Sequence, residues 1–140
     1  APEWLMHIPC GEKAVVMMEG ISMYLPMRGL VELLSALKAH FEEIHLLMDA
    51  YTEFAVKASK VKNPINEVGA MAITGIDYPE NLAEQSGLTY VREHSMTPTK
   101  LIEQLSKSEQ KVFKALYGGK VARKLYRMYE YGEDIFRFRR

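Results

Sequence analysis

The stretch Lys13-Ala14-Val15-Val16-Met17-Met18, followed by Glu19-Gly20, decides the fold. Its apolar residues are continuous rather than alternating, which is typical of a strand covered on both faces. Pro26 then opens a helix as a first-turn proline, and a second apolar run at 44–48 ends in Asp49. Strand, helix and strand with a crossover of about 25 residues predict a right-handed βαβ unit with parallel strands. The helix carries one apolar stripe: Leu30, Leu33, Leu34, Leu37 and Phe41.

The middle of the chain predicts two helices and a strand. Residues 52–61 have a helical pattern. A short helix starts at Asp77-Tyr78-Pro79-Glu80, with Asp77 as its cap, and Gly87 stops it. Residues 88–96 alternate loosely between apolar and polar side chains, which predicts a strand.

The C-terminal part predicts a helical insertion and a last strand. Thr97-Pro98 begins a helix that runs to Leu105, and Ser106 with Glu109 forms a capping box for a long helix. The Gly118-Gly119 pair predicts a kink or short break in it. Residues 134–139 alternate, which predicts a strand with one buried face, antiparallel to the strand before the insertion. Aromatic and aliphatic residues recur every fourth position of the long helix: Phe113, Tyr117, Val121, Leu125 and Tyr129.

Composition predicts one soluble globular domain, residues 1–140. Apolar residues make up 48% and charged residues 26% of the chain, which is ordinary for such a domain. No apolar run approaches the roughly 18 residues of a membrane span, and no signal peptide is visible. The lone Cys10 cannot form an internal disulfide, so we expect the reducing cytoplasm. The start Ala1-Pro2-Glu3 runs almost directly into a buried-type strand, which predicts a piece of a longer protein.

The zero net charge hides two oppositely charged halves. Residues 1–97 carry seven basic and thirteen acidic side chains, a net charge of −6, and residues 98–140 carry a net charge of +6. Internal balance is the simpler interpretation, and a surface for an acidic partner is the other. The long helix is basic, but no recognised nucleic-acid module surrounds it. We therefore expect a solvated helix face, with no nucleic-acid and no membrane partner.

Two carboxylates mark a candidate ligand site. Ligands of open α/β sheets bind at the carboxyl ends of the parallel strands. Glu19 ends the first strand and Asp49 the second, with Gly20, Tyr24 and Tyr51 nearby. These acids either hold an ammonium or hydroxyl group of a ligand, or they cap the following helix or turn. The residues leave both interpretations open.

Metal and nucleophile chemistry have little support in the sequence. His7-x-x-Cys10 is half of a zinc site, and the other histidines lack ligand spacing. No histidine can be placed beside Cys10 to activate it. We expect no metal, and no catalytic residue is assigned.

The segment Val15–Leu25, VVMMEGISMYL, resembles the apolar-strand, Glu-Gly-x-x-x-Tyr-Leu signature of the leucine carboxyl methyltransferase family. This family includes the polyketide-synthesis O-methyltransferases and uses S-adenosylmethionine. The run 46–49, the stretch 75–88 and the closing strand pair also match its layout. The resemblance implies a doubly wound, Rossmann-like α/β sheet of strand order 3-2-1-4-5-7-6. Only its C-terminal half is present, the last four strands, with an antiparallel pair at the end.

The resemblance also implies roles for residues of the site. Glu19 would hold the cationic methionyl part of S-adenosylmethionine, and Gly20 would allow close backbone approach. Tyr24, Asp49 and Tyr51 would lie on the side of a small-molecule acceptor.

The family's glycine-rich cofactor loop has no counterpart in this sequence, because no G-x-G-x-x-G occurs in it. We therefore expect an O-methyltransferase part that is inactive alone. The missing N-terminal half, or a second copy of the chain, would pair with the strand at 13–18, whose apolar edge is open. The alternative is a non-enzymatic α/β interaction module with a basic C-terminal face.

Overall fold

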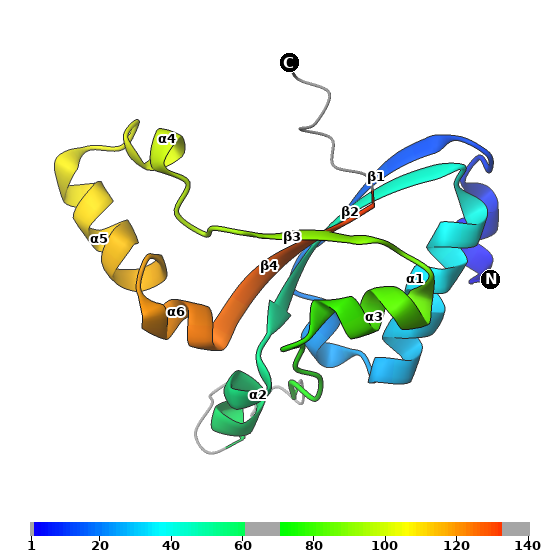
Figure 1. Ribbon diagram of the computed structural model, residues 1–140, viewed down its shortest axis with the longest axis horizontal. Coiled ribbons are helices and arrows are strands. Elements are labelled where there is room, and N and C mark those ends of the chain that lie inside the picture. Colours follow the sequence, from blue (N-terminus) through cyan, green and yellow to red (C-terminus); the bar gives the residue numbers. More distant parts are fainter. Residues whose placement is uncertain (1, 61–70, 133–140) are drawn as a thin grey trace.

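The computed structural model of the protein describes residues 2–60 and 71–132. It forms one four-stranded sheet with helices packed against it and a helical arm at one end (Figure 1). The elements in chain order are η1 (Glu3–His7), β1 (Lys13–Met18), η2 (Ser22–Tyr24), α1 (Met27–His40), β2 (Glu43–Tyr51), α2 (Glu53–Ser59), α3 (Pro79–Ser86), β3 (Tyr90–His94), α4 (Thr99–Ile102), α5 (Lys107–Tyr117), α6 (Lys120–Leu125) and β4 (Tyr126–Tyr131).

The sheet has the strand order β1-β2-β4-β3. β1 and β2 pair in parallel, with Val16 opposite Leu46, and this confirms the predicted βαβ unit. β4 is antiparallel to both β2 and β3 and lies between them. The last strand of the described residues, β4, is therefore inserted between β2 and β3, in agreement with the order 4-5-7-6, and the pair β4–β3 is antiparallel as expected.

The end of the long helix was predicted wrongly. β4 spans Tyr126–Tyr131, where the four-residue repeat predicted the end of the long helix at Tyr129. That helix ends at Tyr117, and α6 follows after the glycine pair, so the predicted break is real. A strand in this position pairs with two neighbours and buries Tyr129 and Tyr131, a burial that a helix exposed to solvent does not provide. The strand expected at 134–139 lies outside the described residues.

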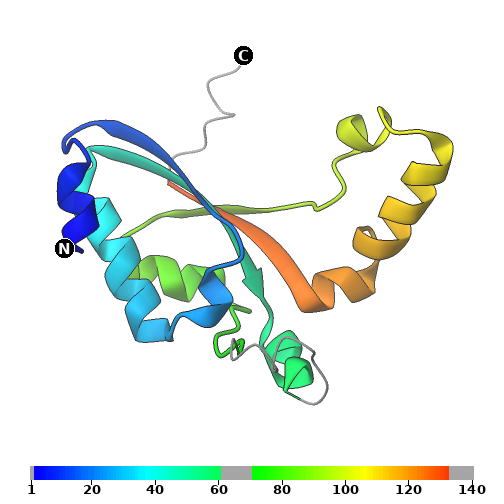
Figure 2. The same cartoon turned by 180° about the vertical axis from the view of Figure 1, so that it is seen from behind.

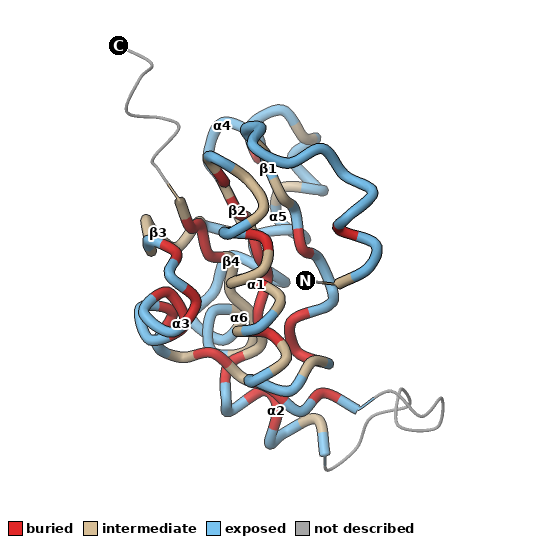
Figure 3. The backbone as a smooth tube through the Cα atoms, turned by 90° about the vertical axis from the view of Figure 1, so that its right-hand side faces the viewer, coloured by how far each residue is buried: buried red, intermediate tan, exposed pale blue. Residues whose placement is uncertain are grey.

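The core lies between the sheet and the helices α1 and α3, which cover one of its faces (Figures 1 and 3). Leu30 and Leu34 of the predicted stripe are fully buried there. Two buried tyrosines of β4 reach the chain around the start of α3: the Tyr129 hydroxyl donates to Ile76 O at 2.7 Å and the Tyr131 hydroxyl to Pro79 O at 3.0 Å. Buried phenols without such acceptors would be costly, so these contacts fix β4 against the core.

The opposite face of β1 is open. Val15 and Met17 are 67% and 73% exposed, whereas Met18 is 6% exposed. The continuous apolar run predicted cover on both faces, and within residues 2–60 and 71–132 only one face is covered. This correction leaves an apolar strand surface and an unpaired outer edge on the described part of the chain.

Two local predictions of helix ends had different outcomes. The Ser106–Glu109 capping box of α5 is present in full, and Gly87 ends α3 with φ 77°. Asp77, however, does not cap α3: its Oδ1 accepts from Glu53 N at 3.0 Å, at the start of α2. Tyr78 precedes α3 instead, with Pro79 in the first turn.

Candidate functional site

Asp49 organises the carboxyl edge of the parallel strands. It lies inside β2, which continues to Tyr51, and it is only 1% exposed. Its two carboxylate oxygens accept from Gly20 N at 2.9 and 2.8 Å, and the Tyr126 hydroxyl donates to Oδ2. Its backbone oxygen accepts from Ser22 Oγ at 2.6 Å. The side chain thus ties the turn after β1 to the first residue of β4.

The turn after β1 requires a glycine. Gly20 has φ 66°, a left-handed conformation that costs a residue with a Cβ about 1–2 kcal/mol. In this conformation its N–H points at the Asp49 carboxylate. The neighbouring Glu19 follows β1 as predicted, but its side chain is exposed.

A cleft of about 650 Å³ lies at this edge of the sheet, within the size range of small-molecule sites. Four of the five predicted site residues line it, namely Gly20, Tyr24, Asp49 and Tyr51, whereas Glu19 does not. The other lining residues are Met23, Ala55, Ser59, Met96, Leu116, Tyr117, Ala122, Leu125 and Tyr126. These four residues lie together on the strand side of the cleft.

The wall opposite the strands comes from the helical arm, which sequence reasoning had not assigned to the site. α5 and α6 extend from the end of the sheet as an arm (Figure 2), and none of the residues of either helix is buried. Tyr117 and Leu125 belong to the apolar four-residue repeat of the long helix, and they line the cleft. The sequence did carry a signal for this wall, because an apolar stripe on an otherwise exposed helix indicates a surface that contacts something other than water.

Two phenols of the cleft, Tyr51 and Tyr126, are held in their neutral form. The pKa of Tyr126 is raised well above its ordinary value, first by burial, then by its hydrogen bond to Asp49 and the negative charges of Asp49 and Glu19. Burial also raises the pKa of Tyr51. The cleft therefore presents uncharged aromatic surfaces around one buried carboxylate.

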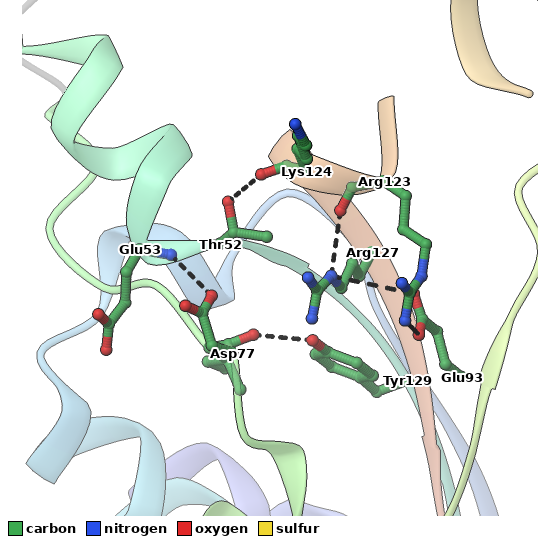
Figure 4. Close-up of polar contacts among 9 residues, drawn as sticks. Thr52, Glu53, Asp77, Glu93, Arg123, Lys124, Arg127 and Tyr129 are labelled. Carbon is green, nitrogen blue, oxygen red and sulfur yellow. Dashed lines mark hydrogen bonds and ion pairs between the residues drawn. The ribbon is translucent and has the colours of Figure 1, made fainter. Parts of the chain in front are cut away.

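Polar contacts hold the arm against the body of the sheet (Figure 4). The Thr52 hydroxyl donates to Lys124 O, and Arg127 Nε donates to Arg123 O at 3.1 Å. Arg123 makes two hydrogen bonds to Glu93 of β3, at 3.0 and 2.8 Å. These contacts span α2, α6 and β3, so the arm side of the cleft has a defined position.

The described residues form neither a cluster of metal ligands nor a membrane-spanning helix. In the described ranges, no three His, Cys, Asp or Glu side chains come together as a metal site. Cys10 is exposed. None of the described helices has the length and apolar character needed to cross a membrane.

Comparison with known proteins gives a likeness of fold. No family model matches the sequence, and no curated protein matches it. The structure is similar to a SAM dependent methyltransferase from Archaeoglobus fulgidus, with TM-score 0.52 and 12% identity over 94% of this chain and 64% of that one. It is also similar to the mycolic acid cyclopropane synthase CmaA1 complexed with SAH and CTAB, with TM-score 0.47 and 12% identity over 92% and 58%.

The chain is therefore a mixed four-stranded α/β structure that matches part of a methyltransferase fold. It spans 64% of the length of the Archaeoglobus enzyme.

Proposed function

We propose that this chain forms the C-terminal part of an S-adenosylmethionine-dependent O-methyltransferase that acts on a small molecule. The observation that carries the proposal is the position of the cleft. It lies at the carboxyl edge of the only parallel strand pair of the described sheet, where α/β sheets bind their ligands. The likeness of fold and the Glu-Gly-x-x-x-Tyr-Leu segment of the leucine carboxyl methyltransferase type support the same assignment.

The proposed roles divide between the exposed end of β1 and the cleft beside it. Glu19 and Gly20, at the end of β1, bind S-adenosylmethionine, with the Glu19 carboxylate on its cationic methionyl part. Tyr24, Tyr51 and the Asp49–Tyr126 pair face the acceptor. Methyl transfer is an in-line displacement, so its rate depends on how the acceptor oxygen is aligned with the sulfonium. Rigid contacts such as Gly20–Asp49–Tyr126 serve that alignment.

A partner at β1 completes the proposed enzyme. The exposed Val15 and Met17 side chains and the open outer edge of β1 favour addition of a further strand with its own covering layer. We propose that the N-terminal half of the methyltransferase domain, or a second copy of this chain, occupies this place. The chain alone is then inactive, because the cofactor has no glycine-rich seat.

Self-association tests this partner. Sedimentation velocity of the isolated chain should show dimers or larger species as concentration rises, and the double variant Val15→Lys, Met17→Lys should shift the distribution to monomer. A well-folded wild-type chain that stays strictly monomeric at high concentration would contradict pairing at β1.

Calorimetry with S-adenosylmethionine on a complete methyltransferase domain tests the cofactor assignment. The variant Glu19→Gln should weaken binding by roughly 1.5–3 kcal/mol, about ten- to a hundredfold, because a charged hydrogen bond is lost. Glu12→Gln is the matched control, since Glu12 is exposed at the opposite end of β1. Unchanged affinity of the Glu19 variant would refute the role of this residue.

One observation supports the alternative, a non-enzymatic interaction module. The arm is basic and exposed along its length, including Lys107, Lys111 and Lys114 of α5. A complete domain that binds an acidic protein through the arm but does not bind S-adenosylmethionine would favour this alternative.

A further inference from the structure

A second cavity adjoins the cleft on the arm side. It has a volume of about 380 Å³ and shares three lining residues with the cleft, namely Met96, Tyr117 and Tyr126. Tyr126, the residue bonded to Asp49, therefore forms part of the boundary between the two spaces. A ligand that fills the cleft past these side chains reaches the second cavity, which we call the basic cavity.

The cleft itself offers mainly apolar contact. Leu116, Leu125 and Met96 line it together with the tyrosines. The Asp49 oxygens already accept from Gly20 and Tyr126, and the Tyr126 hydroxyl already donates to Asp49. An aromatic or aliphatic body fits this surface, because the main polar groups of its floor have satisfied one another.

The basic cavity has the opposite character. Three cations line it, Lys120, Arg123 and Arg127, against a single carboxylate, Glu93. Its histidine, His94, is bonded through Nε2 to Glu130 at 2.5 Å.

The cations differ in how far they are already paired. Glu93 binds Arg123 through two hydrogen bonds and lies 4.0 Å from Arg127, so a single carboxylate serves two guanidinium groups (Figure 4). Lys120 is exposed and forms no ion pair with the residues that the structure describes. The excess positive charge of the basic cavity is therefore centred on Lys120 and Arg127.

We propose that the acceptor is an amphiphilic small-molecule anion. Its aromatic or aliphatic body lies in the cleft, and a carboxylate, sulfonate or phosphate group lies in the basic cavity against Lys120. The role of this anion as methyl acceptor rests on the proposed function. The anionic group is then an anchor remote from the transferred methyl group, since Lys120 lines the basic cavity and not the cleft. Binding of such an anion by this chain requires no cofactor.

Paired probes test the proposal: 2-naphthoate and its neutral counterpart 2-naphthamide, titrated into the 140-residue chain at low salt and followed by NMR. We expect 2-naphthoate to bind about fivefold more tightly, the order expected for one partly exposed ion pair. Lys120→Glu should remove this preference and leave the affinity for 2-naphthamide unchanged. Leu116→Ser should weaken both probes alike, because it changes only the apolar wall.

Lys111→Glu is the matched control, since it makes the same change of charge on α5 at an exposed position that lines neither cavity. The proposal is overturned if the two probes bind equally, if neither binds, or if Lys111→Glu lowers 2-naphthoate affinity as much as Lys120→Glu. Selective 2-naphthoate binding, with no S-adenosylmethionine binding by the complete domain, would keep the anion site and reject the methyltransferase. Binding of S-adenosylmethionine by the complete domain, without selective 2-naphthoate binding, would keep the methyltransferase and reject the anion site.

Discussion

The hydrogen bond from Tyr126 to Asp49 should stabilise the folded chain measurably. The variant Tyr126→Phe removes the hydroxyl and keeps the ring, so packing against Tyr51, at 6.0 Å between ring centroids, is retained. The carboxylate that loses this donor, and keeps only the N–H of Gly20, belongs to a residue that is 1% exposed. A hydrogen bond to a charged group contributes about 1.5–3 kcal/mol, and the buried acceptor cannot turn to water instead. We expect the free energy of unfolding to fall by about 1.5–3 kcal/mol.

Urea unfolding followed by circular dichroism measures this loss, with the m-value as a check that the two-state transition is preserved. Tyr51→Phe is the control, because Tyr51 lines the same cleft and its hydroxyl has no hydrogen bond to the described residues. The control should change stability by less than about 0.5 kcal/mol. If both variants lose the same amount, the Tyr126–Asp49 contact does not stabilise the fold and its role in aligning the cleft fails with it.

Two further predictions concern a glycine of the sheet edge and the alkaline limit of stability. Gly132→Ala should cost at least about 3 kcal/mol by urea unfolding, because φ is 103° and the added Cβ would lie 2.2 Å from Ile44 O. Gly11→Ala, with φ 72° and open space, should cost only about 1 kcal/mol. Burial raises the pKa of Tyr126 and of Tyr131 in the folded state, so their contribution to stability is full below about pH 10, the unfolded pKa, and is lost as pH rises above it. Phenolate absorbance of these residues should then appear together with unfolding, and appearance in a still-folded chain would contradict the burial argument.

The sequence predicted the elements whose signal is local. The apolar run at 13–18, the stripe on α1, the capping box at Ser106 and Gly87 at the end of α3 each depend on neighbours within one or two turns. Local signals of this kind predict the structure correctly because the element that they favour also buries the right side chains. The strand order needed more than local signal, and it came from the family resemblance.

The wrong predictions have one physical cause: contacts between residues far apart in the sequence outweighed local preferences. Residues 126–131 carry the helix repeat of α5, but they also alternate, with Tyr129 and Tyr131 buried on one face of β4. Pairing with β2 and β3 decides between the two patterns, and no local signal reports it. Asp77 was predicted to cap the nearest helix, α3. Its Oδ1 instead accepts a hydrogen bond from Glu53 N, 24 residues earlier in the sequence. In both cases a partner distant in sequence overrode the local preference.

The candidate site was likewise predicted only in part: contacts that follow from local signals were predicted, and those that depend on long-range pairing were not. This difference bears on function. Gly20 and Asp49 could be placed together because the carboxyl ends of parallel strands meet at one edge. Tyr126 could not, because it lies 77 residues after Asp49 and reaches it only through insertion of β4 beside β2. That insertion places the arm, and with it Leu116 and Tyr117, across from the turn after β1. One buried carboxylate thus sets the position of the arm wall relative to Gly20, so a change at Asp49 should disturb both sides of the cleft together.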